Sequence, residues 1–256
     1  MRLKAIQVNI WHGHFLDALL EFLQREDPDI VTMQEVTGGT ENEGPDPSVD
    51  MFTYLRDGLG YQGAIGIAHE SRAGGVRTYC GSAVLVKGTV RSHRTIWLRA
   101  PREGVAWQPP HAEPDFPRFA IEADATVGGR PLRVLSVHGA WTLEPVETPE
   151  KLGQARRLAE HLQSLEGIPF LLGIDANMPP SSTVVQTLDA FARNVVHGSG
   201  ITRTTHPTIH VTAKSKPAGL LVDFVYASSH FRAIRVDAPE VAVTDHLPVR
   251  AVLEWA

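Results

Sequence analysis

The chain has 256 residues, 43% of them hydrophobic and 21% charged, a composition typical of an ordinary globular protein. A net charge of −5 argues against a protein whose whole surface binds duplex DNA, while leaving room for a local basic groove. The only cysteine, Cys80, excludes an internal disulfide, and no apolar run reaches the roughly 18 residues of a membrane span. A candidate strand begins within four residues of Met1, so we expect no signal peptide and a cytoplasmic protein.

The first elements are predicted to be a strand, a helix and a second strand. Residues 5–8 and 30–34 are mostly apolar, as in buried strands. Between them, apolar residues from Phe15 to Leu23 recur at helical spacing, while charged residues take the opposite face. This pattern predicts an amphipathic helix that ends near Pro28, because proline disfavours continuation of a helix.

The same order of elements returns in the second half of the chain. Residues 132–138 predict a strand, residues 152–165 an amphipathic helix, and residues 170–174 a strand apolar throughout, as when both faces are covered. If both units wind right-handed, their strand ends can face the same edge of the molecule. We therefore expect an α/β fold that forms one domain over residues 1–256.

Shorter strands and loops are expected outside these two units. Residues 81–87 and 119–123 predict short strands, and residues 127–130 predict a hairpin turn. Three stretches are predicted to be loops: residues 38–50, 101–117 and 198–218. The second of these loops carries Trp107 and five of the 18 prolines.

The predicted strands share one feature, a polar residue at or near the end that can bind a metal ion or a phosphate. In chain order these residues are Asn9, Glu35, His138, Asp175 with Asn177, Asp223 after the apolar residues 220–222, and Asp245 with His246. Open α/β sheets build a catalytic edge in this way. Together the residues predict a single polar site with metal-assisted chemistry.

The carboxylates and the amide suggest particular tasks. Asp175 and Asn177 stand two residues apart at a strand end and can face one substrate, so Asp175 could polarise water while Asn177 donates to a phosphoryl oxygen. The alternative for this pair is an Asx turn that closes the strand. Glu35 follows an interior run, where Mg²⁺ or Mn²⁺ would offset the cost of burying its charge. The alternative is an exposed glutamate or one paired with an arginine.

Two of these polar residues are histidines, His138 and His246. Asp223 and the Asp245-His246 pair predict a carboxylate that holds an imidazole in one tautomer. The oriented imidazole of His246 could bind phosphate or donate a proton, and His138 could assist from another strand end. For any one of the 12 histidines, the alternative is a structural or solvated side chain.

A second hypothesis comes from His12-Gly13-His14, directly after the first strand. Zinc amidohydrolases also begin with His-x-His at this place. That hypothesis needs further histidines at the ends of later strands, where this chain mostly offers Asp, Asn and Glu. The alternative is a loop that leads into the first helix.

With these residues in place, the sequence resembles the endonuclease/exonuclease/phosphatase, or deoxyribonuclease I-like, superfamily over nearly its whole length. Residues 28–36, PDIVTMQEV, resemble the family strand "PDIxxLQE", whose glutamate binds the metal, and residues 244–249, TDHLPV, match "SDHxPV". Supporting matches are VNIW at 8–11, GSAVL at 81–85, SVH at 136–138, GIDAN at 173–177 and LVDFV at 221–225. Trp11 stands where some abasic-site members carry an aspartate, which weakens the analogy to those enzymes.

The resemblance implies a four-layer α/β/β/α sandwich, in which two mixed sheets pack face to face with helices outside. It also implies a metal-dependent phosphoesterase, either a phosphodiesterase, a nuclease or a phosphatase. The implied roles are Mg²⁺ or Mn²⁺ binding by Asn9, Glu35 and Asp245, water activation by Asp175, phosphate binding by Asn177, charge stabilisation by His246 held by Asp223, and assistance at the leaving group or a phosphate oxygen by His138. A non-catalytic binding member of the same fold is a further alternative.

The substrate is less well defined by the sequence. Six basic residues could steer a phosphate, or be solvated surface charges: Arg72, Arg77, Arg118, Arg203, Lys214 and Lys216. The acidic residues 41–46 would repel a polyanion if they line the cleft. With the negative net charge, they favour a small phosphodiester or phosphomonoester over long duplex DNA. A nuclease acting on single strands, ends or short oligonucleotides remains an alternative.

Overall fold

The computed structural model describes residues 1–44, 46, 48–73, 75–101 and 116–256. Its elements in chain order are β1 (Arg2–Asn9), the 3-10 helix η1 (Trp11–Gly13), α1 (Leu16–Glu26), β2 (Ile30–Gly38), the 3-10 helix η2 (Gly39–Glu41), α2 (Met51–Leu59), β3 (Gln62–Ala73), β4 (Val76–Val86), β5 (Gly88–Arg99), β6 (Arg118–Val127), β7 (Arg130–His138), α3 (Pro149–Ser164), β8 (Phe170–Asp175), α4 (Thr183–Asp189), β9 (Arg193–Asn194), β10 (Asp223–Ala227), β11 (Phe231–Asp237) and β12 (Val249–Trp255). Most of the loop predicted at residues 101–117, with Trp107, lies outside the described residues.

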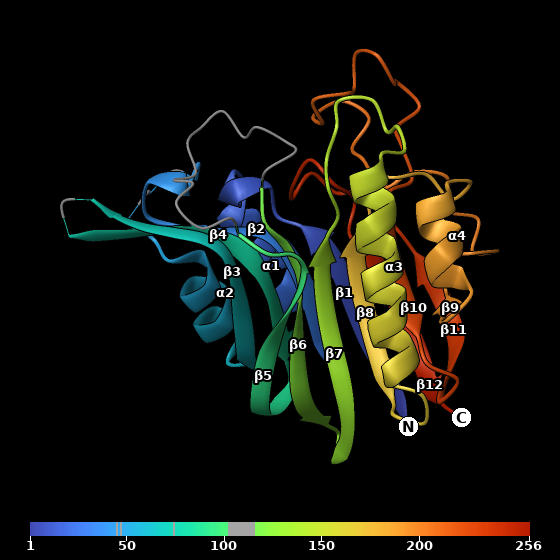
Figure 1. The fold of residues 1–256 in the computed structure, drawn as a ribbon. Helices are drawn as coiled ribbons and strands as arrows, with labels where there is room; N and C mark the ends of the chain where they lie inside the picture. Colours follow the sequence, from blue (N-terminus) through green and yellow to red (C-terminus); the bar gives the residue numbers. More distant parts are fainter. Residues whose placement is uncertain (45, 47, 74, 102–115) are drawn as a thin grey trace.

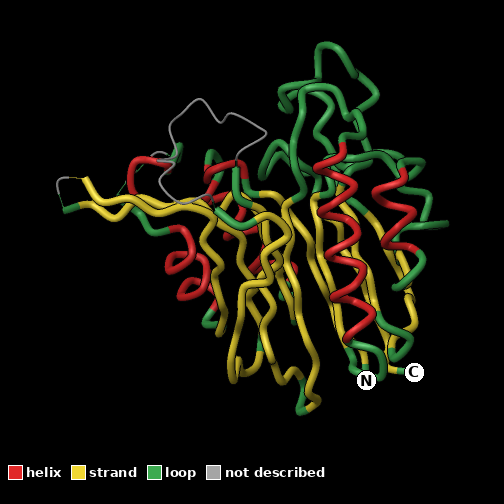
Figure 2. The backbone as a smooth tube through the Cα atoms, viewed as in Figure 1, coloured by secondary structure: helices red, strands yellow, loops and turns green. Residues whose placement is uncertain are grey.

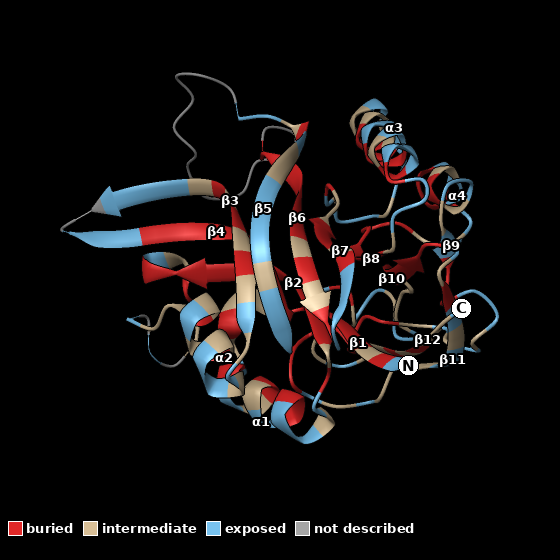
Figure 3. Ribbon diagram, turned by 90° about the horizontal axis from the view of Figure 1, so that it is seen from below, coloured by how far each residue is buried: buried red, intermediate tan, exposed pale blue. Residues whose placement is uncertain are grey.

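The described strands form two mixed sheets of six, which pack face to face (Figures 1 and 3). The strand order is β11-β12-β1-β2-β4-β3 in one sheet and β5-β6-β7-β8-β10-β9 in the other. Helices α1 and α2 cover the outer face of the first sheet, and α3 and α4 cover that of the second (Figure 3). The predicted four-layer α/β/β/α sandwich is confirmed. Among the described residues, no helix combines the length and apolar character that crossing a membrane requires.

The two predicted strand–helix–strand units are confirmed. In each unit the two strands are parallel and adjacent: β1 with β2, joined through α1, and β7 with β8, joined through α3. Parallel neighbours need such a crossover, and their carboxyl ends then lie at one edge. Helix α3 begins where Thr148 accepts a hydrogen bond from the backbone N–H of Lys151, with Pro149 in the first turn. The hairpin turn between β6 and β7 lies where glycines at 128 and 129 predict it.

Two predicted strand ends are wrong. Strand β2 does not stop at Glu35 but continues to Gly38, with a β-bulge between Gln34 and Val36 where Glu35 takes a φ of 56°. Asp223 begins β10 rather than ending a strand, and residues 220–222 are not a strand. The reason is direction: β10 runs antiparallel to β8 with Asp223 opposite Asp175, so the amino end of β10 lies at the same edge as the carboxyl end of β8.

Between the sheets, the apolar core is interrupted by a buried inter-sheet polar cluster of Gln7, Thr32, Gln34 and Ser136. The Gln7 side-chain amide donates to Gln34 Oε1 at 2.5 Å, and Thr32 Oγ1 donates to Gln7 Oε1 at 2.7 Å. Across the interface, Gln34 Nε2 donates to Ser136 Oγ at 2.9 Å. Because each of these buried groups has a partner, the cluster fixes how one sheet sits on the other.

Gly173 of β8 leaves the space that this cluster fills. A Cβ at this position would collide with Thr32 Oγ1 and Gln7 Oε1. We expect Gly173→Ala to lower the free energy of unfolding by about 1–3 kcal/mol, because overpacking displaces buried hydrogen-bonded groups. Urea unfolding measures this change.

Gly153→Ala in α3 is the matched control, because nothing lies within 4 Å of a Cβ built there. It should raise the free energy of unfolding by about 0.5–1 kcal/mol, since alanine is the better helix former. If Gly173→Ala unfolds at the wild-type urea concentration, the steric role of this glycine is refuted.

Candidate active site

A polar cleft of about 300 Å³ opens where β1, β7 and β8 end. Long loops gather at this end of the sheets, whereas both chain termini lie at the other end (Figure 2). Seven of the eight predicted site residues line the cleft: Asn9, Glu35, His138, Asp175, Asn177, Asp245 and His246. The eighth, Asp223, is fully buried and contacts His246 from behind. The structure therefore brings all eight predicted residues together.

Asn9 connects two of the carboxylates. Its amide nitrogen lies 3.0 Å from Glu35 Oε1 and 3.0 Å from Asp175 Oδ2, so it can donate one hydrogen to each. Its amide oxygen accepts the backbone N–H of Trp11 at 3.0 Å. In this arrangement, Asn9 holds Glu35 and Asp175 at a set separation in addition to any part that its oxygen takes in metal binding.

Backbone strain gathers around this cleft. Among the described residues, five other than glycine have a positive φ, and four of them line the cleft: Trp11, His12, Glu35 and Asn177. Each such conformation costs on the order of 1–3 kcal/mol and persists only where the surroundings enforce it. At Glu35 the strain belongs to the bulge of β2. Gln34 before it faces the other sheet, and Val36 after it faces the core under α1 and α2. The bulge lets the Glu35 side chain between them point into the cleft.

Asp175, at the end of β8, lies at the centre of the site. Its Oδ1 accepts the backbone N–H of Asn177 at 3.0 Å, and its Oδ2 lies 3.6 Å from His138 Nε2 and 3.9 Å from His246 Nε2. Burial, reinforced by repulsion from Asp223, raises the pKa of Asp175 to about 7. A carboxyl group with this pKa can take up a proton near neutral pH.

His246 is oriented by Asp223. Its Nδ1 donates to Asp223 Oδ2 at 2.8 Å, so its Nε2 points toward Asp175. The other oxygen of Asp223 accepts from Gln7 at 3.2 Å, which connects this histidine to the inter-sheet polar cluster. Burial opposes a charge on the ring, but Asp223 and Asp175 outweigh it and raise the pKa of His246 well above its usual value. An imidazolium is therefore stabilised here.

The donor set fits a hard divalent cation. Glu35, Asp175, Asp223 and Asp245 bring four carboxylates together, with side chains between 1% and 20% exposed. Burial raises the pKa of Asp245 to about 6, because it and the repulsion from Glu35 outweigh the attraction to His246. Burial also raises the pKa of Glu35, but His12 and other neighbours outweigh it, and that pKa falls to about 2. Carboxylate oxygens are the ligands that Mg²⁺ and Mn²⁺ prefer. Among the described residues, the ligand atoms that lie within 4.8 Å of one another form two groups, Asp175 with Asp223 and His246, and Asp245 with His210 and His246.

The two histidines of the amidohydrolase hypothesis take different partners. His12 Nε2 lies 3.3 Å from Glu35 Oε2 and lines the cleft. His14 Nε2 lies 3.4 Å from Glu43, and its ring stacks on Trp11 with centroids 3.8 Å apart. Among the described residues, the groups suited to a metal contain neither histidine. His12 and His14 therefore contact different glutamates, Glu35 and Glu43.

Of the six basic residues proposed to steer phosphate, Arg118 is the one that lines the cleft among the described residues. It is buried at the start of β6. Arg77 pairs with Glu70, Arg203 with Glu240 and Lys216 with Glu144, and Arg72 and Lys214 are exposed. Glu43 of the acidic loop lines the cleft as well. The site therefore has little positive charge for a long polyanion.

Sequence reasoning missed several residues that line the cleft. Phe116 and Trp141 add aromatic surface, Cys80 is a buried residue of β4, and His210 and Val211 come from the loop at 198–218. None of these stands at the end of a strand, so the pattern of polar strand ends could not reveal them. His210 leaves one local signal, the sequence His-Val-Thr at residues 210–212.

Comparison with known proteins agrees with this geometry. The model of the endonuclease/exonuclease/phosphatase family matches residues 6–246. The chain belongs to this family. Its members are phosphoester hydrolases, and the predicted superfamily is thereby confirmed. A search of curated proteins finds no match.

Solved structures share the fold at low sequence identity. An endonuclease/exonuclease/phosphatase from Bacteroides vulgatus has a TM-score of 0.73 and 19% identity, with 100% of both chains covered. A mannosyl-6-phosphatase from Bacteroides thetaiotaomicron has a TM-score of 0.72 and 13% identity, covering 99% of this chain and 100% of that one. TDP2 of D. rerio, complexed with a single-strand DNA product, has a TM-score of 0.69 and 13% identity, with 99% of both chains covered.

The raised pKa of Asp175 predicts how stability depends on pH in the metal-free protein. An ordinary aspartate loses its proton near pH 4, whereas folded Asp175 keeps it to about pH 7. The folded state therefore binds more protons between these values, and the free energy of unfolding decreases as pH rises. We expect the free energy of unfolding to fall less steeply with pH in Asp175→Asn than in the wild type, by up to about 1.4 kcal/mol per pH unit. Urea unfolding in EDTA at several pH values measures both slopes.

Asp57→Asn serves as the control for this experiment. Asp57 is exposed and paired with Arg56, and its pKa is lowered by that contact, so it stays ionised in both states above about pH 5. Its substitution should leave the slope unchanged. Equal slopes in the wild type and in Asp175→Asn would contradict the prediction.

Proposed function

We propose that this protein is a divalent-metal-dependent phosphoesterase in which Asp175 activates the attacking water. The observation that carries the proposal is the convergence of Asp175, Asn177 and the Asp223–His246 pair on one cleft. These groups supply a proton acceptor, an amide and an oriented imidazole, the set that water attack on a phosphoester needs.

Glu35 and Asp245 would hold Mg²⁺ or Mn²⁺, with the Asn9 oxygen as a further candidate ligand. When bound, such an ion neutralises charge on the phosphoryl oxygens. The number of carboxylates at the site supports this assignment. The imidazolium of His246 supplies one positive charge for Glu35, Asp175, Asp223 and Asp245, so further positive charge would stabilise the ionised carboxylates.

The remaining steps belong to the side chains themselves. Ionised Asp175 accepts a proton from water as the water oxygen bonds to phosphorus. The ester P–O bond breaks, its electron pair goes to the leaving oxygen, and that oxygen then takes a proton from solvent. Asn177, two residues along, donates to a phosphoryl oxygen, and the imidazolium of His246 stabilises the negative charge that develops. His138, at the end of β7, would assist at the leaving group or at a phosphate oxygen. Burial and the positive charge of Arg118 lower the pKa of His138 to about 3, so its imidazole is neutral.

The cleft favours a compact substrate over long duplex DNA. Among the described residues, one arginine, Arg118, and no lysine line the cleft, and Glu43 lines it with the opposite charge. Trp11, Phe116 and Trp141 supply apolar surface. The similar structures include a mannosyl-6-phosphatase and a protein complexed with single-strand DNA, which represent both remaining substrate classes. We propose a small phosphodiester or phosphomonoester, or the end of a short single strand.

The direct test is a panel of phosphoesters assayed in Mg²⁺ and in Mn²⁺. It should include bis-p-nitrophenyl phosphate, sugar phosphates, inositol phosphates, sphingomyelin, RNA, and single- and double-stranded DNA. We expect Asp175→Ala to lower kcat at least about 100-fold on any substrate that the wild type hydrolyses, because it removes the proton acceptor. Asp57→Asn, an exposed carboxylate change, should leave kcat unaltered. Full activity in Asp175→Ala would refute the proposed mechanism.

Metal binding is tested separately from hydrolysis. We expect Glu35→Gln to weaken Mn²⁺ binding at least about tenfold, because loss of a ligand should cost at least as much as loss of the hydrogen bonds that orient ligands. Isothermal titration calorimetry measures the dissociation constant. Glu70→Gln, which alters a glutamate paired with Arg77 on β3 and β4, is the control and should bind Mn²⁺ as the wild type does. Equal affinity in all three proteins would exclude Glu35 as a ligand.

A further inference from the structure

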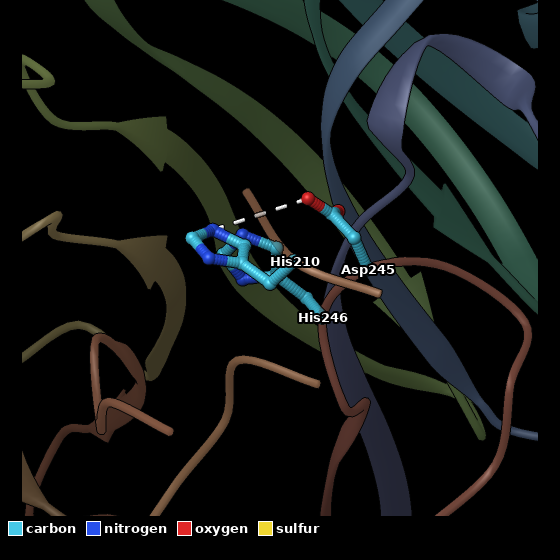
Figure 4. A group of neighbouring side chains, drawn as sticks. All are labelled: His210, Asp245 and His246. Atoms are coloured by element: carbon cyan, nitrogen blue, oxygen red, sulfur yellow. Dashed lines mark ion pairs between the residues drawn. The ribbon is translucent and has the colours of Figure 1, made fainter. Parts of the chain in front are cut away.

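His210 lines the cleft from the loop at 198–218, and the mechanism above does not use it. Its side chain is 9% exposed, and its Nε2 lies 3.9 Å from Asp245 Oδ2 (Figure 4). Its ring meets that of His246 edge to face, with centroids 5.2 Å apart. One ring nitrogen of each histidine and one carboxylate oxygen of Asp245 lie within 4.8 Å of one another.

The hydrogen bonds of Thr212 determine which ring nitrogen of His210 carries the proton. The backbone N–H of Thr212 donates to His210 Nδ1 at 3.2 Å, and the Thr212 hydroxyl lies 2.8 Å from the same atom. A backbone amide can only donate, so Nδ1 must offer a lone pair. In the neutral ring the proton therefore sits on Nε2, the nitrogen that faces Asp245 and the cleft.

This tautomer distinguishes His210 from a metal ligand. A histidine that binds a metal through Nε2 presents a lone pair there and donates its Nδ1–H to an acceptor. His246 has that arrangement at Nδ1, where Asp223 is the acceptor. His210 has the reverse arrangement, because Thr212 occupies its Nδ1 as a donor. The ring is therefore set to donate from Nε2 into the cleft.

We propose that His210 contacts the substrate, its Nε2–H donating a hydrogen bond to a non-bridging oxygen of the phosphate. The inference rests on the proposed phosphoesterase function and adds a residue to it. Two nitrogens separated by less than twice a hydrogen-bond length of about 2.9 Å can both reach one phosphate oxygen. One ring nitrogen of His210 and one of His246 lie within 4.8 Å of each other, and the Nε2 atoms are the ones that face the carboxylates of Asp245 and Asp175. A phosphate held by His246 therefore lies within reach of His210.

The loop holds His210 in register with the reacting residues. Thr205 and His246 form an antiparallel bridge, the N–H of His206 donates to the carbonyl of Asp245 at 2.8 Å, and Leu247 donates to Thr204. The segment that carries His210 is thus fastened to the segment that carries Asp245 and His246. Such attachment sets the donor in place before the substrate arrives, which lowers the entropic cost of the contact.

The same loop provides an internal control. His206-Pro207-Thr208 repeats the His-x-Thr pattern, and the N–H of Thr208 donates to His206 Nδ1 at 3.3 Å. His206, however, is not among the residues that line the cleft. A substitution at His206 therefore removes the same local contact without removing a donor from the site.

The first test compares His210→Gln with His210→Leu on a substrate that the wild type hydrolyses. Glutamine keeps an N–H donor at similar reach, whereas leucine keeps only the bulk. We expect kcat/KM to fall about tenfold to 100-fold in His210→Leu, to stay within about threefold of the wild type in His210→Gln, and to be unchanged in His206→Leu. Equal losses in the leucine and glutamine variants, or no loss in either, would overturn the inference. The proposed function would still stand if Asp175→Ala remained inactive.

The second test needs no activity and uses the folded wild type. Nitrogen-15 NMR of the histidine rings, with His210 assigned through His210→Gln, should show Nδ1 unprotonated and Nε2 protonated. Inorganic phosphate added with Mg²⁺ should shift the Nε2 signal of His210 and leave that of His206 in place. A proton on Nδ1, a signal unmoved by phosphate, or loss of the Nε2 proton on adding Mg²⁺ or Mn²⁺ alone would each overturn the inference. This result stands even if the panel shows no hydrolysis, which would overturn the proposed function alone.

Discussion

The site depends on the pairing of three neighbouring strands. In β7, β8 and β10, the register sets His138 opposite Asp175 and Asp175 opposite Asp223, so three reacting or orienting side chains stand in one row. Cross-strand neighbours are separated by roughly 5 Å, which is close enough for each charge to alter the next. The raised pKa of Asp175 follows from this row, because its carboxyl group is buried beside the carboxyl group of Asp223. Moving any of the three strands by one residue would turn its side chain to the other face of the sheet.

Such a row of buried carboxylates is costly, and the surrounding structure offsets the cost. His246 pairs with Asp223, the Asn9 amide bridges Glu35 and Asp175, and Gln7 connects Asp223 to the cluster between the sheets. The inter-sheet polar cluster is thus continuous with the reacting residues. A change in how the sheets pack would alter the position of His246, because hydrogen bonds connect Gln7 to Asp223 and Asp223 to His246.

The edge of the sheets and the loops above it contribute differently. The edge presents the groups proposed to act on water, phosphate and charge. These come from the ends of β1, β7 and β8, the start of β10, the bulge in β2 and the segment that precedes β12. The 3-10 helix η1 and the loops supply the aromatic surface of Trp11 and Trp141 and the imidazole of His210. Because loops tolerate change more readily than paired strands, the proposed reaction would depend mainly on residues held by the sheets, and the proposed choice of substrate on residues of the loops.

The sequence by itself determined the fold class, the two strand–helix–strand units and all eight residues that converge on the cleft. It could do so because hydrophobic periodicity and short polar motifs are local properties of the chain. Tertiary structure alone decided that Glu35 sits in a bulge, that Asp223 begins its strand, and that Arg118, of six candidate cations, faces the cleft. The physical reason is that strand direction, register and the path of a loop depend on partners distant in the chain. His210 shows this most clearly, since its local His-x-Thr pattern is repeated at His206 and only contact with the Asp245–His246 segment distinguishes the two.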